Sequence, residues 1–206
     1  MNSRLFCLLC LTITCSYFNV RASGDEVTVK YFFGSRWPGC RQFGRGDFEK
    51  LYATFQDDSN VNFELHPAVR SPQDNCIEEQ GCDWERVTLC AFNQTNTSGK
   101  VNFLACMDAA AETPLTQVAL NAGKRCASTA NVDAKEMTAC YNGDQGENLL
   151  EAASKVWNKQ FPKPSFVPHT FVNSKDVQAD YSDLKKAICN DLPSSPACGS
   201  LKYNYI

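Results

Sequence analysis

The chain of 206 residues has only two histidines, His66 and His169, and beyond residue 22 it has no Cys-x-x-Cys pair. Zinc sites made of cysteine and histidine usually show such close ligand spacing, so the sequence disfavours a metal centre, and no cofactor is expected. A cysteine protease that uses Cys40 with either histidine is also disfavoured. No local protease signature is present, and each histidine adjoins a proline, where a structural role is commoner.

The chain also lacks an apolar run of the roughly 20 residues that a membrane-spanning helix needs. Its most apolar stretch is Leu5 to Cys15, which follows Arg4 and precedes Val20-Arg21-Ala22. A basic residue, a short apolar run and small residues in this order are typical of a secretory signal peptide. We therefore expect residues 1–22 to be removed and the remaining chain to be secreted and not membrane-spanning.

A run of basic residues is missing as well. The formal charge is −3, and the loss of Arg4 and Arg21 with the leader makes it −5. An acidic balance without a basic patch argues against a dedicated nucleic-acid binder.

Cysteine, in contrast, is abundant. Removal of residues 1–22 takes away three of the 12 cysteines and leaves nine, an odd number. In an oxidising compartment eight of them can form four disulfides. We expect the eight to be Cys76, Cys82, Cys90, Cys106, Cys126, Cys140, Cys189 and Cys198, with Cys40 left over.

The pairing of these cysteines stays open, because eight cysteines allow 105 connectivities. If Cys82 and Cys90 lie on one helix, they are about 12 Å apart and cannot pair with each other. Cys76 is a candidate partner for one of them. Two glycosylation acceptors, Asn93 and Asn96, lie in a polar stretch and agree with a secreted, surface-exposed loop.

The order of predicted elements indicates an α/β protein. A β-branched and aromatic run over residues 27–33 predicts a buried strand, and a helix is expected from Pro38 to Phe55, interrupted at Gly44 and Gly46. A second strand, 61–65, would pair parallel with the first. Further helices are expected over residues 83–92, 103–126, 132–140, 147–157 and 181–189, the second of them broken at Pro114. A strand is expected over residues 165–173.

The stretch Trp37-Pro-Gly-Cys40 lies where the first strand meets the first helix. Oxidoreductases of the thioredoxin class carry Cys-x-x-Cys at this junction, and here Trp37 stands in place of the first cysteine. Dithiol reduction needs an exposed thiolate that attacks and a second thiol that resolves the mixed disulfide. Trp37 can do neither. We interpret Cys40 as a buried thiol without a catalytic role that packs as a small apolar side chain. The alternatives are a single-thiol role and an additional disulfide, formed within the chain or with another molecule.

The mature chain resembles the gamma-interferon-inducible lysosomal thiol reductase (GILT) family, especially its insect GILT-like members. The resemblance rests on Val27-Thr-Val-Lys-Tyr-Phe32, the cluster Cys76, Cys82 and Cys90, Phe103-Leu-Ala-Cys-Met107, Lys124-Arg-Cys126, Cys140-Tyr-Asn-Gly143, Gly146-Glu-Asn-Leu-Leu150, Phe166-Val-Pro168 and Val172-Asn173. It implies a thioredoxin-like fold with a large disulfide-rich helical insertion: one domain over 23–206, its core at 25–70 and 161–192 and its insertion at 71–160.

The resemblance also assigns site residues. Pro168 matches the family's proline beside the redox site, expected to be cis, and Trp37, Pro168 and Phe166 would form an apolar patch. Two departures concern the reductase chemistry. The nucleophilic cysteine is replaced by Trp37, and the family's Cys-Gln-His-Gly-x-x-Glu-Cys becomes the shorter, histidine-free Cys76-Ile-Glu-Glu-Gln-Gly-Cys82.

We therefore expect a secreted GILT-like protein without dithiol reductase activity that works by binding. Its partner would be a protein, a cell surface or a pathogen component, since the family's insect members are associated with immunity. The alternative is a residual thiol-disulfide oxidoreductase that uses Cys40 as a single thiol, in an acidic lysosomal or endosomal compartment. A structural or carrier role is a third possibility.

Overall fold

The computed structural model describes residues 26–71, 75–76, 82–110 and 118–203. The expected signal peptide and the expected break at Pro114 lie outside these residues. The elements, in order, are β1 (Val27–Phe33), α1 (Pro38–Phe43), a π-helix (Gly44–Phe48), α2 (Glu49–Phe55), β2 (Val61–Pro67), β3 (Val69–Ser71), β4 (Asn75–Cys76), α3 (Asp83–Phe92), α4 (Thr97–Ala110), α5 (Ala119–Cys126), a 3-10 helix (Ala127–Ala130), α6 (Ala134–Asn142), α7 (Asp144–Gln160), β5 (His169–Val172), β6 (Lys175–Val177), α8 (Tyr181–Asp191) and a 3-10 helix (Pro196–Tyr203).

The main sheet has the strand order β2-β1-β5-β6. β1 pairs parallel with β2, as the predicted β-α-β pattern requires, and antiparallel with β5, which pairs antiparallel with β6. β1 is central, and its Val27, Val29 and Tyr31 are fully buried. Side chains alternate across a strand, so Tyr31 lies on the face that contacts Phe43 and Phe48, whereas Phe32 lies on the opposite face.

The helix predicted from Pro38 to Phe55 is present but changes its geometry in the middle. Residues 44–48 form a π-helical turn between α1 and α2. A Cβ atom on Gly44 would overlap the Oδ2 atom of Asp108, which comes from α4. The glycine that lowers helix propensity here therefore allows α4 to pack closely against the widened turn.

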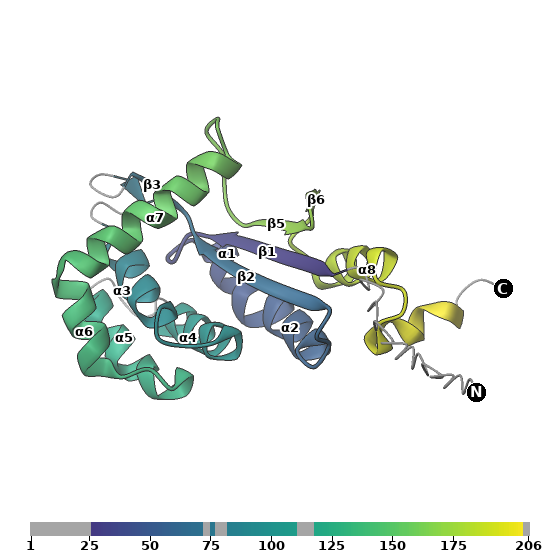
Figure 1. The fold of residues 1–206 in the computed structure, drawn as a ribbon, viewed down its shortest axis with the longest axis horizontal. Helices are drawn as coiled ribbons and strands as arrows, with labels where there is room; N and C mark the ends of the chain where they lie inside the picture. The colour runs from purple at the N-terminus through teal and green to yellow at the C-terminus, as the bar shows by residue number, and fades with distance from the viewer. Residues whose placement is uncertain (1–25, 72–74, 77–81, 111–117, 204–206) are drawn as a thin grey trace, which may run out of the picture.

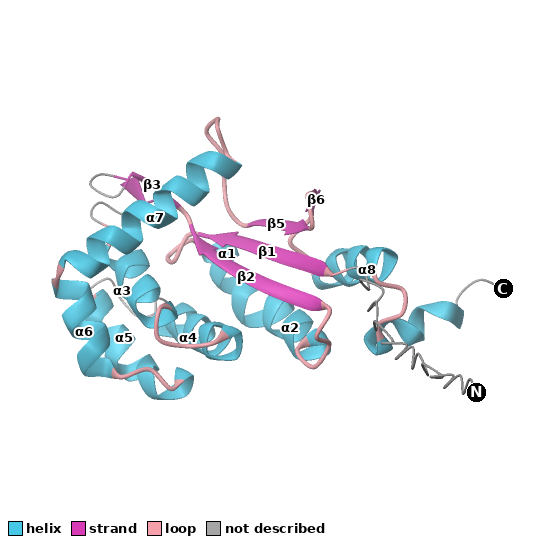
Figure 2. Cartoon of the chain, in the orientation of Figure 1, coloured by secondary structure: helices cyan, strands magenta, loops and turns pink. Residues whose placement is uncertain are grey.

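Helices α3 to α7 form a body at one end of the sheet, while α8 packs near the opposite end (Figures 1 and 2). Two disulfides join helices of this body. Cys90–Cys140 links α3 to α6, and Cys106–Cys126 links α4 to α5. On the other side of the molecule Tyr181 of α8 approaches Thr54 of α2 with its hydroxyl group.

Several predicted boundaries in the helical region were wrong. α4 begins at Thr97 instead of Phe103, because the Asn96 side chain accepts a hydrogen bond from the Gly99 amide and caps a polar first turn without an apolar stripe. α7 begins at Asp144 instead of Glu147. The region also contains the short β3–β4 ladder, which was not expected.

The predicted strand over residues 165–173 is also too long. Only His169–Val172 pairs with β1, and the cis-proline Pro168, which lacks a backbone donor, directly precedes the paired residues.

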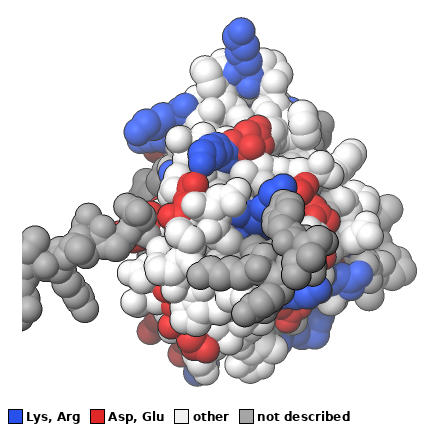
Figure 3. Space-filling model, turned by 90° about the vertical axis from the view of Figure 1, so that its right-hand side faces the viewer, with Lys and Arg blue, Asp and Glu red and all other residues white. Residues whose placement is uncertain are grey.

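Within the described residues, no helix combines the length and apolarity needed to cross a membrane. On the face shown in Figure 3, basic side chains lie among acidic ones and neither sign forms a continuous patch.

Candidate functional site around Trp37, Cys40 and Pro168

The turn between β1 and α1 presents Trp37 to solvent. The Trp37 amide donates to the Gly34 carbonyl, which closes the turn, and Trp37 then occupies the N-cap of α1 with Pro38 at the first helical position. Proline suits that position because its fixed φ is helical and its missing N–H would have no intrahelical acceptor. The Trp37 side chain is 46% exposed, whereas Trp84 and Trp157 are buried.

Cys40 lies one turn further into α1 and is only 1% exposed. It is outside the four disulfides of the described residues, and its sulfur accepts a hydrogen bond from the Gly34 amide at 3.4 Å. The thiol therefore faces the turn from inside the molecule. A substrate sulfur cannot reach it without movement of the covering residues.

A polar network lies behind Cys40. The Tyr31 hydroxyl donates to the Cys40 carbonyl at 2.9 Å. Burial raises the pKa of Tyr31 well above its usual range, and the nearby Cys40 and Asp108 add to this rise. Tyr31 is thus held in its neutral, donating form. Asp108 is 2% exposed, so α4 contributes a buried acidic residue to the surroundings of the motif.

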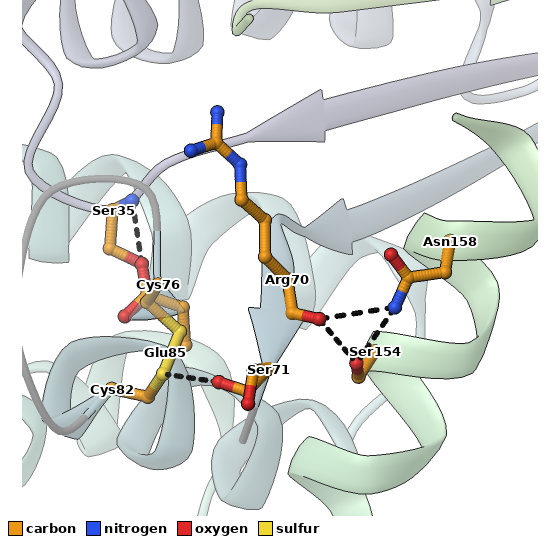
Figure 4. The surroundings of a disulfide bond; sticks show 8 residues. All are labelled: Ser35, Arg70, Ser71, Cys76, Cys82, Glu85, Ser154 and Asn158. Carbon is orange, nitrogen blue, oxygen red and sulfur yellow. Dashed lines mark hydrogen bonds between the residues drawn. A yellow bond between two sulfur atoms is a disulfide. The ribbon is translucent and has the colours of Figure 1, made fainter. Parts of the chain in front are cut away.

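A second buried acid supports the turn itself. Glu85 of α3 is 3% exposed, and its Oε1 accepts a hydrogen bond from the Ser35 amide at 3.1 Å. Figure 4 shows Glu85 close to the Cys76–Cys82 disulfide, whose two residues precede α3. The Cys76–Cys82 disulfide therefore lies next to the carboxylate that holds the turn carrying Trp37, whereas the altered residues 77–81 lie outside the described residues.

Pro168 completes the site. The Val167–Pro168 peptide bond is cis. A Cβ atom on Gly39 would lie 3.2 Å from Trp37 Nε1 and 3.8 Å from Pro168 Cδ, so Gly39 fits between the two side chains. The structure thus brings Trp37, Cys40 and Pro168 together. Phe166, 70% exposed, packs instead against His169, with ring centroids 4.6 Å apart.

A groove of about 360 Å³ begins at this point and follows α1 and the π-helix. It is lined by Gly39, Gln42, Phe43, Gly46, Asp47, Pro168 and Ala179. The two glycines leave the helix backbone accessible, and space is open where a Gly46 side chain would be. The groove can accept an extended chain next to an exposed tryptophan.

The structure pairs the eight remaining cysteines as Cys76–Cys82, Cys90–Cys140, Cys106–Cys126 and Cys189–Cys198. Cys82 precedes α3 and Cys90 lies within it, and the two cysteines do not pair with each other.

The two predicted glycosylation acceptors lie between helices. Asn93 follows α3, Asn96 precedes α4, and both are exposed. No group of three or more potential metal ligands occurs in the described part of the chain.

The contacts of the two histidines are with residues other than Cys40. His66 Nε2 is 3.0 Å from Glu64 Oε2, and its ring stacks on Phe32. Burial lowers the pKa of His66, against the opposing influence of Glu64. His169 hydrogen-bonds Ser165 and lies near Asp176. These contacts give no support to a protease centred on Cys40.

Sequence reasoning missed Glu85 and Asp108. Acidic residues in helices are normally exposed, and Glu85 stands in the first turn of a helix, where a carboxylate is favourable in any case. Asp108 directly follows Phe103-Leu-Ala-Cys-Met107, and nothing in that stretch distinguishes it from an exposed acidic residue. Only the packing of α3 and α4 against the β1–α1 region shows their burial.

Comparison with known proteins supports the fold. No protein-family model matches the sequence, and no curated protein matches it. Oxidised BdbD from Bacillus subtilis is structurally similar with a TM-score of 0.62 and 20% identity, covering 83% of this chain and 90% of that protein. DsbA from Chlamydia trachomatis has a TM-score of 0.63 at 12% identity, covering 80% and 85%.

The oxidoreductase DsbA from Xylella fastidiosa gives a TM-score of 0.56 at 20% identity, covering 83% of this chain and 88% of that protein. The chain is thus similar to DsbA-like thiol-disulfide oxidoreductases in structure, and its thioredoxin-like α/β fold is confirmed. At these identities the similarity establishes the fold alone. The four disulfides agree with maturation in an oxidising compartment.

Proposed function

We propose that this chain is a secreted, GILT-like thioredoxin-fold protein that has no dithiol reductase activity and binds an extended polypeptide segment at the groove beside Pro168. The observation that carries the proposal is the exposed Trp37 at the N-cap of α1, where a dithiol enzyme needs its attacking cysteine. Without that thiol no mixed disulfide can form at the surface of the turn.

The contacts around the groove support a peptide ligand. Pairing of β5 with β1 begins only at His169, so the backbone at Val167 is outside that ladder. An extended segment can hydrogen-bond to such a backbone, while its side chains contact Trp37 and the glycine-lined groove. Exposed tryptophan is enriched among the residues that dominate binding energy at interfaces.

The intrinsic fluorescence of Trp37 offers a direct binding experiment, because the other two tryptophans are buried. We expect a reduced, alkylated and unfolded polypeptide to shift the tryptophan emission of the purified mature protein. Trp37→Ala should weaken binding at least about tenfold, the effect of losing an interface aromatic. Binding of this variant is measured with a labelled form of the same polypeptide.

Two further variants distinguish binding at the groove from nonspecific apolar binding. Gly46→Leu places a side chain in the open groove and should also weaken binding. Val156→Ala, which removes another exposed apolar side chain, on α7, should bind like the wild type. Equal binding by wild type, Trp37→Ala and Gly46→Leu would refute the groove as the site.

A second function, single-thiol exchange by Cys40, is favoured by one contact. The Gly34 amide donates to the Cys40 sulfur, and such a donor stabilises a thiolate at the start of a helix. A disulfide-reduction assay separates the two functions. Turnover that Cys40→Ser abolishes would support the enzyme. No turnover, together with alkylation of Cys40 only after denaturation, would support the binding protein.

The proposal also includes removal of a signal peptide, glycosylation and the class of binding partner. We propose that residues 1–22 are a signal peptide, that residues 23–206 form one domain and that Asn93 and Asn96 carry glycans. Enzymatic deglycosylation of the secreted protein should reduce its mass, and Asn93→Gln or Asn96→Gln should each remove part of that change. Pull-down from the native secretion tests for a protein, cell-surface or pathogen ligand.

A further inference from the structure

Three polar side chains lie in line beside the cis-proline. Ser165 Oγ is 3.1 Å from His169 Nε2, and His169 Nδ1 is 3.3 Å from Asp176 Oδ2. With the Nδ1 proton donated to Asp176, the Nε2 atom is left to accept the proton of the Ser165 hydroxyl. We propose that Ser165, His169 and Asp176 form a hydrolytic site for small apolar carboxylic esters, independent of the groove and of Cys40.

The imidazole is held in place by aromatic rings. Its centroid is 5.0 Å from that of Phe161 and 4.6 Å from that of Phe166, and it stacks on Phe171 at 6.0 Å. The His169 side chain is only 13% exposed, whereas that of Asp176 is 60% exposed. The ring therefore cannot turn freely, and each of its nitrogens keeps its own partner. A general base of this kind needs such a fixed orientation.

Ser165 is positioned from the other side by Arg70. The Arg70 side chain points away from the Cys76–Cys82 disulfide (Figure 4), and its Nη2 donates to the Ser165 carbonyl at 2.8 Å. The Arg70 carbonyl is in turn held by Ser154 of α7. Arg70 Nε is buried and has no hydrogen-bond partner. The guanidinium therefore fixes the Ser165 backbone and brings a positive charge close to that residue.

The chemical step uses only these groups and water. Ser165 Oγ attacks the ester carbonyl carbon while its proton passes to His169 Nε2. The carbon–oxygen bond to the alcohol then breaks, and the alcohol takes that proton. Water, deprotonated by His169, attacks the acyl-serine, which releases the carboxylic acid and restores the Ser165 hydroxyl. Asp176 orients the imidazole through Nδ1 and does not touch the substrate, so it is a positioning residue, as is Arg70.

The surroundings indicate the substrate class. Phe166 is 70% exposed and lies beside both Ser165 and the His169 ring, so it offers an apolar surface to an acyl group. Ser165 itself is partly exposed. The connector that carries it contains Pro162 and Pro164, which restrict its backbone and present the serine from a stiff loop.

The experiment uses the mature, disulfide-intact protein with p-nitrophenyl acetate and a fluorophosphonate probe. We expect the probe to label Ser165, as located by mass spectrometry of the wild type, and Ser165→Ala to lower ester hydrolysis at least tenfold. Asp176→Asn should lower kcat several-fold at an unchanged KM, because it disturbs only the imidazole. Ser174→Ala removes an exposed serine from the turn before β6 and should retain wild-type hydrolysis.

Labelling at other residues only, or wild-type hydrolysis by Ser165→Ala, would overturn the proposal. The site of the label is read on the unmodified protein, so this result does not depend on the folding of any variant.

Discussion

The hydroxyl of Tyr31, in the central strand, donates to the carbonyl oxygen of Cys40, in the first helix, across 2.9 Å. Both residues are buried, so this bond ties the middle of the sheet to the first turn of α1 from inside the core. It involves the Cys40 backbone and therefore persists whatever side chain occupies the position. The framework of the motif is thus held independently of thiol chemistry.

Tyr31→Phe should consequently destabilise the fold. The change leaves the Cys40 carbonyl without its side-chain donor, and losing one partner of a buried hydrogen bond costs about 1–2 kcal/mol. Urea denaturation measures the loss. Tyr52→Phe is the matched control, because it removes the hydroxyl of a half-buried tyrosine that packs on Phe63. An equal loss for both variants would mean that the Tyr31–Cys40 bond contributes nothing specific.

The two glycines of the π-helix should respond in opposite ways to alanine. At Gly44 a Cβ atom would overlap Asp108 Oδ2, so Gly44→Ala should destabilise by about 1–3 kcal/mol, the usual cost of overpacking. At Gly46 space is open, and Gly46→Ala should be neutral or stabilising by up to about 1 kcal/mol. Thermal unfolding of both variants tests this difference. A Gly44→Ala protein as stable as Gly46→Ala would contradict the close approach of α4.

The disulfides should contribute to stability according to the length of chain they close. Cys90–Cys140 spans 50 residues and Cys189–Cys198 spans nine. Loop-closure entropy predicts losses of about 4 kcal/mol for the first and about 2.5 kcal/mol for the second when both cysteines are replaced by alanine. Denaturant midpoints of the two double variants compare them directly. A larger loss for the short loop would show that packing at the cysteines outweighs chain entropy.

Acidification should destabilise the protein through His66. Its folded-state pKa is lowered, chiefly by burial, below the ordinary value of about 6.5. Between these two pKa values the unfolded chain binds a proton that the folded chain does not. The contribution is therefore complete above about pH 6.5 and is lost as the pH falls towards the folded-state pKa.

Melting temperatures between pH 7.5 and 5 test this prediction. The difference in melting temperature between the wild type and His66→Gln should shrink or change sign towards the acidic end, because glutamine does not titrate. A constant difference over the whole range would exclude His66 as a cause of the pH dependence. Carboxylates that are not in contact with His66 affect both proteins equally and cancel in the comparison.

Local sequence signals predicted a large part of the fold. The β-branched and aromatic run gave strand β1 with its observed bounds, and Pro38 marked the start of α1. The start of α4 was missed because Thr97-Ser98-Gly99-Lys100 carries no apolar periodicity, and its cap is a single asparagine. β6 was missed because its three residues contain only one apolar side chain, Val177.

The candidate site was predicted only where its residues are close in the sequence. Trp37 and Cys40 are three positions apart, and their relation to Pro168 came from a family resemblance. Glu85 and Asp108 belong to distant helices, and the alignment of Ser165, His169 and Asp176 depends on the turn between β5 and β6. Nothing in a linear pattern distinguishes such residues from ordinary polar surface residues.

By itself the sequence determined the absence of the first cysteine, the odd number of cysteines beyond residue 22 and the β-α-β beginning. These follow from residue identity and from backbone preferences that act over a few positions. Only the tertiary structure decided that Cys40 is buried, which cysteines pair and that Trp37 stays exposed. Burial and disulfide pairing depend on distances between segments far apart in the chain, and packing sets those distances.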